Sequence, residues 1–224
     1  MIETTIAREK LQVRGDHTLF WPVASVLFVA DVHLGKAATF RNLGRVPIPS
    51  GTTEATLNRL GLALEETRAD RLIILGDLWH AKAGRDARTS AQVQSWRDRY
   101  DRVEMTLVEG NHDRRAGRLP PEFRMNEVDE DERLGPFRLR HYPDAQEEGY
   151  VLAGHIHPAV TLRGAGKQAL SLPCFWFGAR VGVLPSFGDF TGSISVRPRA
   201  SDAVYVPCEG RVLAVGSKRD PAVL

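Results

Sequence analysis

Six of the seven histidines in this 224-residue chain fall in short motifs, and most of these motifs directly follow an apolar run. The four motifs that follow such runs are Asp31-Val-His33, Gly76-Asp77, Gly110-Asn111-His112-Asp113 and Gly154-His155-Ile-His157. Side chains two residues apart lie on the same face of a strand, so Asp31 and His33 can reach one point, as can His155 and His157. Imidazole, carboxylate and amide groups without thiolate suit Mn, Fe, Zn or similar ions rather than calcium.

Adjacent side chains in the third motif suggest a division of labour. On an extended backbone, Asn111 and His112 must face different ways. One of them is then expected to point toward a metal and the other toward a substrate.

The apolar runs predict the strands that carry these motifs. Residues 26–30, 72–75 and 103–108 resemble the buried strands of an α/β sheet. Residues 51–67 have leucines at helical spacing and complete a βαβ unit, and residues 85–100 are predicted to form a second helix. Open α/β sheets bind their ligands at the carboxyl ends of the strands, which is where the motifs stand.

The second half of the chain is predicted to consist mostly of strands. The expected strands are 137–142, 150–157, 168–177, 181–184, 203–206 and 211–215. Before them, an edge strand with a turn is expected at 10–20, a long loop over the site at 36–49 and a solvated acidic turn at 127–132. No repeat or linker divides the sequence, so residues 1–224 are expected to form a single domain.

Asp77 has two interpretations at this stage. A buried carboxylate at the tip of a strand needs a partner, and a metal cation is a suitable one. Alternatively, Asp77 caps a following helix, a position that aspartate often takes. If a helical turn begins at Asp77, the side chain of His80 points to the same side.

Composition excludes several classes of protein. The net charge of +2 gives no global polyanion signal, so any nucleic-acid contact must rest on local patches. The N-terminus lacks the apolar segment of a signal peptide, and the run from Val23 to Ala30 is too short to span a membrane. Cys174 and Cys208 match no metal-ligand spacing and are expected to be reduced thiols in a cytoplasmic protein.

The four motifs, together with His141, resemble the signature of the calcineurin-like metallophosphoesterase superfamily, in the same order. The resemblance spans Asp31 to His157 and implies a four-layer αββα sandwich of two mixed sheets flanked by helices. It also implies two divalent metal ions, the first held by Asp31, His33 and His157, and the second by Asn111, His141 and His155. Asp77 would bridge the metals, His112 would be the catalytic histidine, and Asp113 would orient His112.

Two histidines, His141 and His80, each have two possible interpretations. His141 is followed by Tyr142-Pro143, whereas the family often has glycine there, so His141 is either a ligand or a surface strand residue. His80 either supports the catalytic histidine, as a comparable histidine does in break-repair nucleases of the superfamily, or lies on a helix surface. His17 is expected in a plain turn.

The chemistry is consistent with this resemblance. Two metals about 3.5–4 Å apart can activate a water molecule and neutralise charge on phosphoryl oxygens. A proton donor near the leaving oxygen is then required, and His112 can supply it. No covalent phosphoenzyme is expected.

Three blocks narrow the resemblance to the bacterial DNA ligase-associated metallophosphoesterases. They are Asp31-Val-His-Leu-Gly-Lys36, Gly76-Asp-Leu-Trp-His80 and Leu184-Pro-Ser-Phe-Gly-Asp-Phe-Thr-Gly192. The resemblance to this group implies that the protein is a manganese-dependent phosphodiesterase and single-strand DNA endonuclease. It also implies a role in DNA repair, in association with a ligase, a helicase and an exonuclease.

Side chains near the motifs could contact DNA. The candidates for phosphate contacts are Lys36, Arg41, Arg45, Lys82, Arg85, Arg88, Arg114, Arg115 and Arg118. The alternative is an ordinary solvated face. Trp79, Phe187 and Phe190 could stack on a base, or they could belong to the core.

Two other functions remain open from the sequence. A small-molecule or nucleotide phosphodiesterase, or a pyrophosphatase, would use the same metals with a different pocket. A non-catalytic scaffold subunit is the second, although the presence of His112 beside a complete ligand set argues against it.

Overall fold

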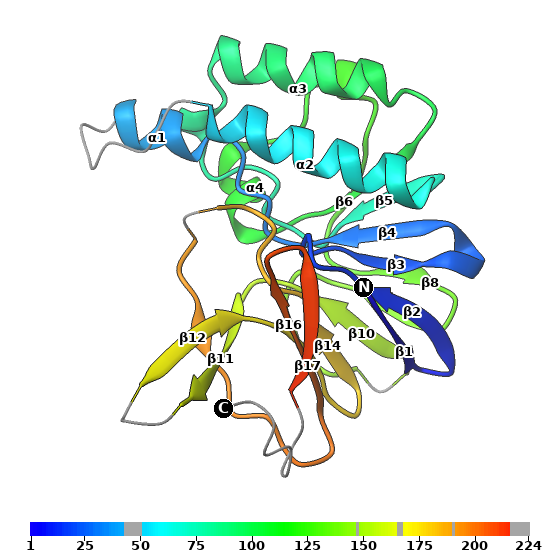
Figure 1. Ribbon diagram of the computed structural model, residues 1–224. Coiled ribbons are helices and arrows are strands. Elements are labelled where there is room, and N and C mark those ends of the chain that lie inside the picture. The colour runs from blue at the N-terminus through cyan, green and yellow to red at the C-terminus, as the bar shows by residue number, and fades with distance from the viewer. Residues whose placement is uncertain (43–50, 147, 165–167, 190, 216–224) are drawn as a thin grey trace.

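Two seven-stranded sheets packed against each other form the centre of the structure (Figure 1). The computed structural model describes residues 1–42, 51–146, 148–164, 168–189 and 191–215. Its α-helices are α1 (Lys36–Asn42), α2 (Thr52–Thr67), α3 (Ala87–Arg99) and α4 (Asn111–Ala116). Short 3-10 helices occur at Pro22–Ala24, Lys82–Gly84 and Pro121–Phe123.

The first sheet contains the predicted βαβ unit. Its strands, in spatial order, are β1 (Ile2–Ile6), β2 (Glu9–Val13), β3 (Leu19–Trp21), β4 (Val26–Val29), β5 (Arg71–Ile74), β6 (Glu104–Val108) and β7 (Asn126–Val128). From β4 to β7 the neighbours pair in parallel, while β1 to β4 pair antiparallel. The strand expected at 10–20 is therefore present as β2 and β3, but β1 forms the edge.

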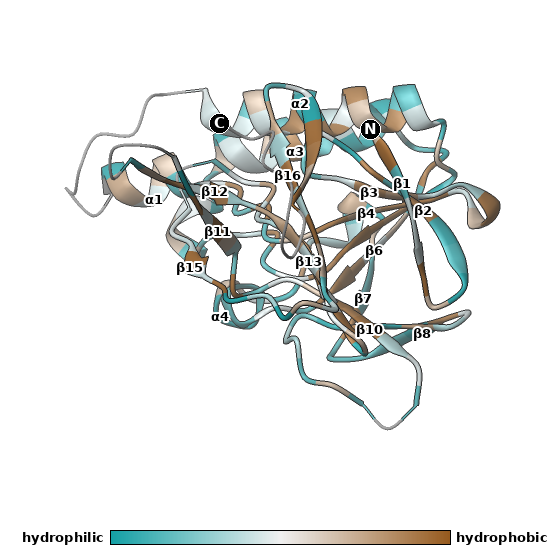
Figure 2. Cartoon of the chain, turned by 60° about the horizontal axis from the view of Figure 1, so that its bottom comes forward, coloured by the Kyte–Doolittle hydropathy of each residue, from teal (hydrophilic) through white to brown (hydrophobic). Residues whose placement is uncertain are grey.

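Helices α2 and α3 cover one face of the first sheet (Figure 1). Leu57, Leu60 and Leu64 of α2 recur at helical spacing and are buried together with Trp96 of α3. Helix α3 begins at a side-chain cap, because Asp86 accepts a hydrogen bond from the backbone of the first turn. In Figure 2 the sheet strands β4 and β6 are largely coloured as hydrophobic, as expected for strands with two covered faces.

The second sheet supplies the other half of the central core. Its strands, in spatial order, are β17 (Arg211–Val215), β16 (Ala203–Cys208), β13 (Phe175–Phe177), β14 (Val181–Val183), β10 (Tyr150–Ala153), β9 (Phe137–Leu139) and β8 (Glu132–Leu134). Leu152 and Phe175 face Phe28 and Leu75 of the first sheet. The expected α/β architecture with two mixed sheets is confirmed.

A small third sheet lies on the outer face of the second one. It contains β11 (Pro158–Arg163), β12 (Ala169–Pro173) and β15 (Ile194–Ser195). Trp176 and Val204 point outward and pack with residues of β11 and β12, whereas the neighbouring Phe175 points inward. Among the described residues, strands rather than α-helices thus cover this face, which differs in detail from the expected outer helical layer.

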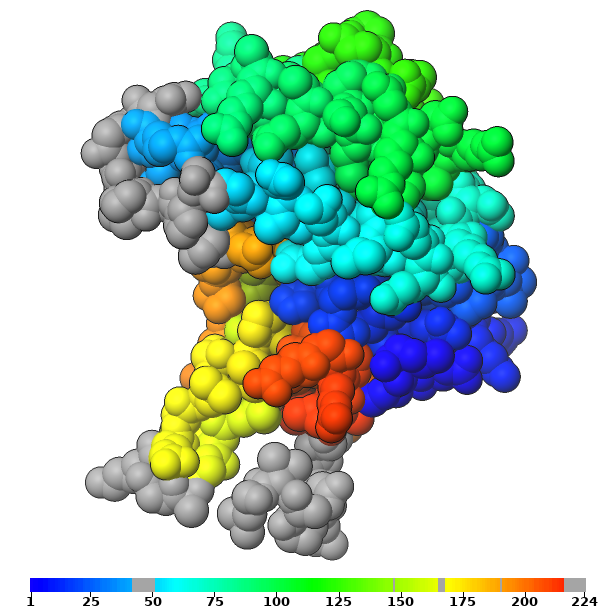
Figure 3. Space-filling model, turned by 45° about the horizontal axis from the view of Figure 1, so that its top comes forward, coloured from blue at the N-terminus to red at the C-terminus, as the bar shows by residue number. Residues whose placement is uncertain are grey.

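The two ends of the described chain meet at the edges of the two large sheets. In Figure 3, strand β17 lies against the N-terminal strands, and the β11–β12 hairpin projects from the body. The hydroxyl groups of Tyr205 and Thr4 join β16 to β1 at 2.9 Å.

The predictions of local structure were wrong at the two places where α1 and α4 form. Residues 36–42 of the expected loop form helix α1, and residues 43–50 lie outside the described part. Asn111 and His112 begin helix α4 instead of lying on an extended backbone. The apolar run before them predicts the strand, but it does not fix how the chain turns after its end.

Candidate metal centre

The four motifs meet at the carboxyl ends of β4, β5, β6 and β10, where the strands stop and the chain turns. The segments after β4 and β5 remain hydrogen-bonded beyond the sheet, since the amide of His33 donates to the carbonyl of Asp77 at 2.8 Å. The motif after β10 joins them through the amide of His155, which donates to Oδ2 of Asp31 at 2.9 Å.

Asp31, His33 and His157 form the first cluster of possible metal ligands. The Nε2 atoms of His33 and His157 lie 3.4 Å apart, and Nε2 of His157 is 3.5 Å from Oδ1 of Asp31. Asp31 is fully buried, and its Oδ1 atom has no hydrogen-bond partner among the described residues. A buried carboxylate oxygen without a partner, facing two imidazole nitrogens, is the arrangement that a cation would complete.

Asp77, His141 and His155 form the second cluster. Nε2 of His141 lies 3.1 Å from Nδ1 of His155, 3.5 Å from Oδ1 of Asp77 and 3.1 Å from Oδ1 of Asn111. His141 is 1% exposed, so it is not the surface histidine of the alternative interpretation. The carbonyl of Leu75 lies 3.1 Å from its Nδ1, which directs Nε2 into the cluster.

The protonation of these groups fits divalent cations. Burial lowers the pKa of His33 to about 2 and also lowers the pKa of His141, so both rings are neutral and can offer lone pairs. Burial lowers the pKa of His157 too, but the carboxylate of Asp31, 3.5 Å away, outweighs burial and the net shift is upward. Burial raises the pKa of Asp77, and a bound cation would favour its ionised form.

Left-handed backbone conformations occur at most of these ligand positions. The φ angles are 54° at Asp31, 51° at His33, 52° at Asp77, 71° at His155 and 46° at His157. These residues follow the strands instead of extending them, so the expected strand geometry, with side chains on one face, was wrong. A sharp turn at each residue directs the side chains together, a conformation that is uncommon outside glycine and often found at functional sites.

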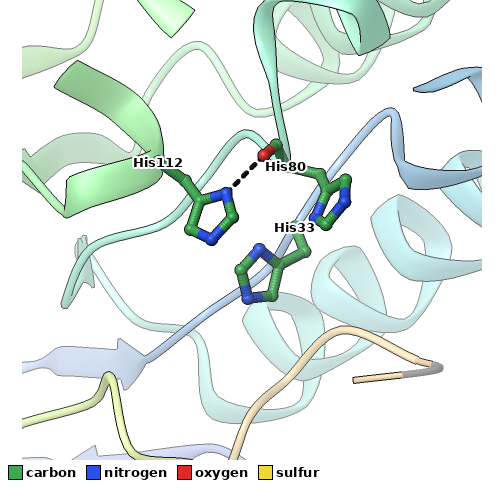
Figure 4. Close-up of side chains that lie close together, drawn as sticks. All are labelled: His33, His80 and His112. Atoms are coloured by element: carbon green, nitrogen blue, oxygen red, sulfur yellow. Dashed lines mark hydrogen bonds between the residues drawn. The ribbon is translucent and has the colours of Figure 1, made fainter. Parts of the chain in front are cut away.

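His112 lies beside the clusters, on helix α4 (Figure 4). Its Nδ1 atom is 2.5 Å from the carbonyl oxygen of His80, which can only accept, so Nδ1 carries the proton. Its Nε2 atom then faces the site, 4.0 Å from Oδ2 of Asp77. The backbone amide of His112 donates to Oδ1 of Asp77 at 2.9 Å, so Asp77 caps α4 rather than a helix that directly follows it.

His80 contacts His112 in two ways. Its carbonyl accepts the His112 hydrogen bond, and the two rings stack 5.3 Å apart with the His80 ring also stacked on Phe40. Burial lowers the pKa of His80 to about 4. No helical turn begins at Asp77, so the helix-surface interpretation of His80 was wrong, and His33, His80 and His112 form a third group of close ring nitrogens.

The expectation that Asp113 orients the His112 ring was wrong. The carboxylate of Asp113 accepts hydrogen bonds from the amides of Trp79 at 3.0 Å, Gly110 at 3.0 Å and Leu78 at 3.3 Å. Burial raises its pKa to about 7, against the effect of these donors. Asp113 thus joins the segment after β5 to the start of α4, while the His80 carbonyl orients His112.

The block from Leu184 to Gly192 forms hydrogen bonds with two residues of the first cluster, Asp31 and His157. The Ser186 hydroxyl and the Gly188 amide donate to the carbonyl of Asp31 at 2.9 and 3.0 Å, and the Gly192 carbonyl accepts from Nδ1 of His157 at 2.8 Å. His17 lies in a turn as expected, and its Nδ1 is 2.8 Å from the carbonyl of Ser186. Sequence reasoning singled out the block but missed this contact with Asp31 and His157.

Arg59 of α2 anchors the same block. Its guanidinium donates to the carbonyl of Phe187, pairs with Asp189 at 3.0 Å and lies 4.4 Å from the Phe187 ring centre. An Arg59→Ala variant is expected to weaken metal binding by about tenfold, the lower end for residues that support ligands. Manganese titration by calorimetry should show the loss at one of two sites, with Arg102→Ala, an exposed arginine elsewhere, as the control. Equal weakening of both sites would contradict this role.

Gly110 permits the close approach of Asp77 to helix α4. A Cβ atom at residue 110 would overlap Oδ1 and the backbone nitrogen of Asp77. A Gly110→Ala variant is therefore expected to displace Asp77 and to lose more than about 90% of activity, comparable to losing a supporting residue. Steady-state rates and bound metal should fall together, whereas Gly164→Ala, where the space is open to ordinary contact, should remain near wild type. Wild-type activity of Gly110→Ala would show that Asp77 can shift without consequence.

The basic residues expected to contact DNA have different surroundings. Arg41, Lys82 and Arg115 are exposed, and burial lowers the pKa of the half-buried Lys36. Arg114 pairs with Glu130 at 3.0 Å, and Arg45 lies outside the described residues.

The structure corrects the expectation that Arg85 contacts phosphate. Its guanidinium donates to the carbonyls of Ala116, Gly117 and Arg118 at 2.6–2.9 Å, and it lies over the Trp79 ring. These bonds satisfy carbonyls at the end of α4, so Arg85 is a structural residue rather than a phosphate contact.

Trp79 and Phe187 are not available for base stacking. Both side chains are 0% exposed and belong to the core between α2, α3 and the first sheet. The prediction that they stack on a base was therefore wrong. Phe190, the third aromatic residue of that prediction, lies outside the described residues.

A two-sheet α/β fold with adjoining Asp/His clusters at strand ends, and a histidine directed at them, defines a metal-dependent phosphoesterase. Residues 24–173, more than half of the chain, match the Calcineurin-like phosphoesterase family model. The chain belongs to this family, as the motifs indicated. A scaffold without catalytic function is thereby set aside.

One solved structure is similar to this chain over nearly its whole length. The crystal structure of Pseudomonas putida nuclease MPE is 40% identical, covers 96% of this chain and 99% of its own, and has a TM-score of 0.84. A second match is Yfce, a phosphoesterase from E. coli, with 16% identity, a TM-score of 0.39 and coverage of 86% and 92%. No curated protein sequence matches the chain significantly. Among the described residues, no helix has both the length and the apolar character needed to cross a membrane.

Proposed function

We propose that this protein is a manganese-dependent phosphodiesterase that cuts single-stranded DNA during DNA repair. The observation that carries the proposal is the 40% identity to a nuclease over 96% of the chain. The donor set of the site supports it, because all ligand groups are imidazole, carboxylate or amide. Iron or zinc could occupy the same donors.

Each cluster is assigned to one metal in this proposal. Asp31, His33 and His157 would hold the first, and Asn111, His141 and His155 the second, with Asp77 between them. When bound, two divalent cations supply Lewis acidity to a water nucleophile and to the phosphoryl oxygens.

The protein groups around the metals have separate tasks. The Nδ1–H of His112 donates to the His80 carbonyl, so Nε2 is directed at the site. In its doubly protonated, imidazolium form, His112 would give the Nε2 proton to the leaving oxygen and become neutral. The ring of His80 limits rotation of His112 by stacking on it. Asp113 acts as a positioning residue, because it fixes the backbone on both sides of the His80–His112 contact.

The proposal also covers the domain organisation, the cellular location and the partner proteins. We propose that residues 1–224 form one metallophosphoesterase domain, a view supported by the core that both large sheets share. A cytoplasmic location is supported by the two cysteines, which are free thiols in the structure. Cooperation with a DNA ligase, a helicase and an exonuclease is supported by the sequence blocks of the ligase-associated group.

A cleavage assay with manganese tests the proposal. Circular single-stranded DNA, duplex DNA of the same sequence and bis-p-nitrophenyl phosphate should be compared, with His112→Ala as the inactive control. Linearisation of the single-stranded circle, absent in the variant, is the expected result. Cleavage of the small diester without any cutting of DNA would instead favour a small-molecule or nucleotide phosphodiesterase.

A further inference from the structure

A cavity of about 660 Å³ lies on the outer face of the second sheet. Trp176 of β13 and the start of β14 line it, together with Arg180, Arg197 and Arg199. Pro143 lines it as well. Its combination of one aromatic ring and three guanidinium groups is unlike the core-packed aromatic residues of the metal centre.

The indole of Trp176 is held in one orientation. Because Phe175 and Phe177 point into the core, Trp176 points outward, and it is only half-buried. Its Nε1 donates to Oδ2 of Asp202 at 2.9 Å, and the same oxygen accepts from the backbone of Arg199 at 2.8 Å. A fixed, partly exposed indole is a stacking surface that loses little freedom when a planar ligand binds.

The side chains that line the cavity carry a net positive charge. Arg180, Arg197 and Arg199 are exposed, and no described carboxylate forms an ion pair with them. Asp202 is the carboxylate that lines the cavity, and its Oδ2 atom already accepts from Trp176 and the Arg199 backbone. These arginines differ in this respect from Arg114, which pairs with Glu130.

The cavity is connected to the metal centre through the segment after His141. Pro143 lines the cavity, and the ring of Tyr142 just before it packs 4.5 Å from the His155 ring. In the sheet, Trp176 pairs with Val183, which pairs with Ala153, two residues before His155. Two strand spacings, about 10 Å in all, therefore separate Trp176 from the strand that ends at the metals.

We propose that this cavity binds the single-stranded DNA next to the scissile phosphate. One base stacks on Trp176, and the adjacent phosphates pair with Arg180, Arg197 and Arg199. The inference rests on the proposed function and adds a place for the substrate that the metal ligands do not provide. Stacking accepts any base, so the site gives affinity for single strands without sequence preference, and paired bases of a duplex would not reach the indole.

Tryptophan fluorescence gives a direct test. The protein has four tryptophans, and Trp21, Trp79 and Trp96 are at most 8% exposed. Binding of a phosphorothioate oligothymidine to the manganese-loaded wild-type protein should quench its tryptophan fluorescence, because the ligand covers Trp176. The fluorescence of a Trp176→Phe variant should not be quenched. Quenching of equal size in both proteins would overturn the stacking role.

Charge is tested by the combined variant Arg180→Ala, Arg197→Ala and Arg199→Ala. Its affinity for the oligonucleotide should fall at least tenfold, and the slope of log affinity against log salt should fall by about 2, the expectation for three phosphate contacts on a single strand. The rate on bis-p-nitrophenyl phosphate should be unchanged. The matched control replaces Arg8, Arg68 and Arg102, which are all exposed and do not line the cavity, and it should bind like wild type.

The possible outcomes separate the two proposals. Wild-type affinity and salt dependence in the cavity variant would overturn this inference and leave the proposed function intact. If wild-type protein cleaves the small diester but neither binds nor cuts single-stranded DNA, the proposed function fails, and this inference fails with it. Loss of diester cleavage in the cavity variant would show damage to the metal centre and would also count against a separate binding site.

Discussion

Replacing Asp77 with alanine is expected to empty both metal sites and to remove detectable turnover. Its carboxylate lies 3.5 Å from Nε2 of His141 in the second cluster and accepts the backbone amide of His112. Removing it takes away a buried negative charge at the point where the clusters adjoin, so neither cation would keep its balance of charge. Bound manganese should fall from about two ions per chain to less than one.

Elemental analysis after desalting measures this directly. Asp77→Asn is the companion variant, because its amide oxygen can still accept the His112 amide while the charge is lost. If Asp77→Asn also loses metal but keeps its circular dichroism spectrum, charge is the cause. An Asp77→Ala protein that still carries two ions per chain would refute the bridging role.

A His112→Ala variant is expected to keep its metals and to lose about 10²–10⁴ in kcat, the usual contribution of a general acid. The backbone amide that supports Asp77 is unaffected by the side chain, which is why binding and turnover should separate. The loss should be larger for a dinucleotide diester than for bis-p-nitrophenyl phosphate, since p-nitrophenolate leaves without needing a proton.

The control for His112→Ala is a variant of the neighbouring histidine, His80→Ala. His80→Ala retains the backbone carbonyl that accepts from His112 but removes the stacked ring, so its loss of kcat should be smaller. Loss of metal in His112→Ala would identify His112 as a ligand. Equal losses on good and poor leaving groups would exclude the proton-donor role.

The sequence predicted which residues meet, because apolar runs mark parallel strands whose ends share one edge. Asp31 and Asp77 could therefore be placed together before any coordinates were known, whereas His155 follows β10 of the second sheet and was joined to them only by the family resemblance. The backbone that brings them together could not be predicted. Their left-handed turns depend on hydrogen bonds between segments distant in sequence, such as that from the His155 amide to Asp31.

The directions in which side chains point also could not be predicted from the sequence. Trp79 follows a buried strand within a motif, so proximity to the metals suggested a role at the surface, but its ring packs under Arg85 in the core. Trp176 lies in a strand of three residues, and only the sheet reveals that it faces outward between two buried phenylalanines. Asp113 likewise shares a motif with His112 but contacts backbone amides of another segment.

The left-handed turns at five of the proposed ligand positions also have a consequence for folding. Each such turn at a residue with a side chain costs roughly 1 kcal/mol, a notable part of the net stability of a domain, which is about 5–15 kcal/mol. Bound cations would offset this cost, by about 2.7 kcal/mol at a hundredfold excess over the dissociation constant. The metal-free chain should consequently unfold first at the very edge that carries the ligands. Metal supply would then govern how long the protein survives proteolysis as well as whether it is active.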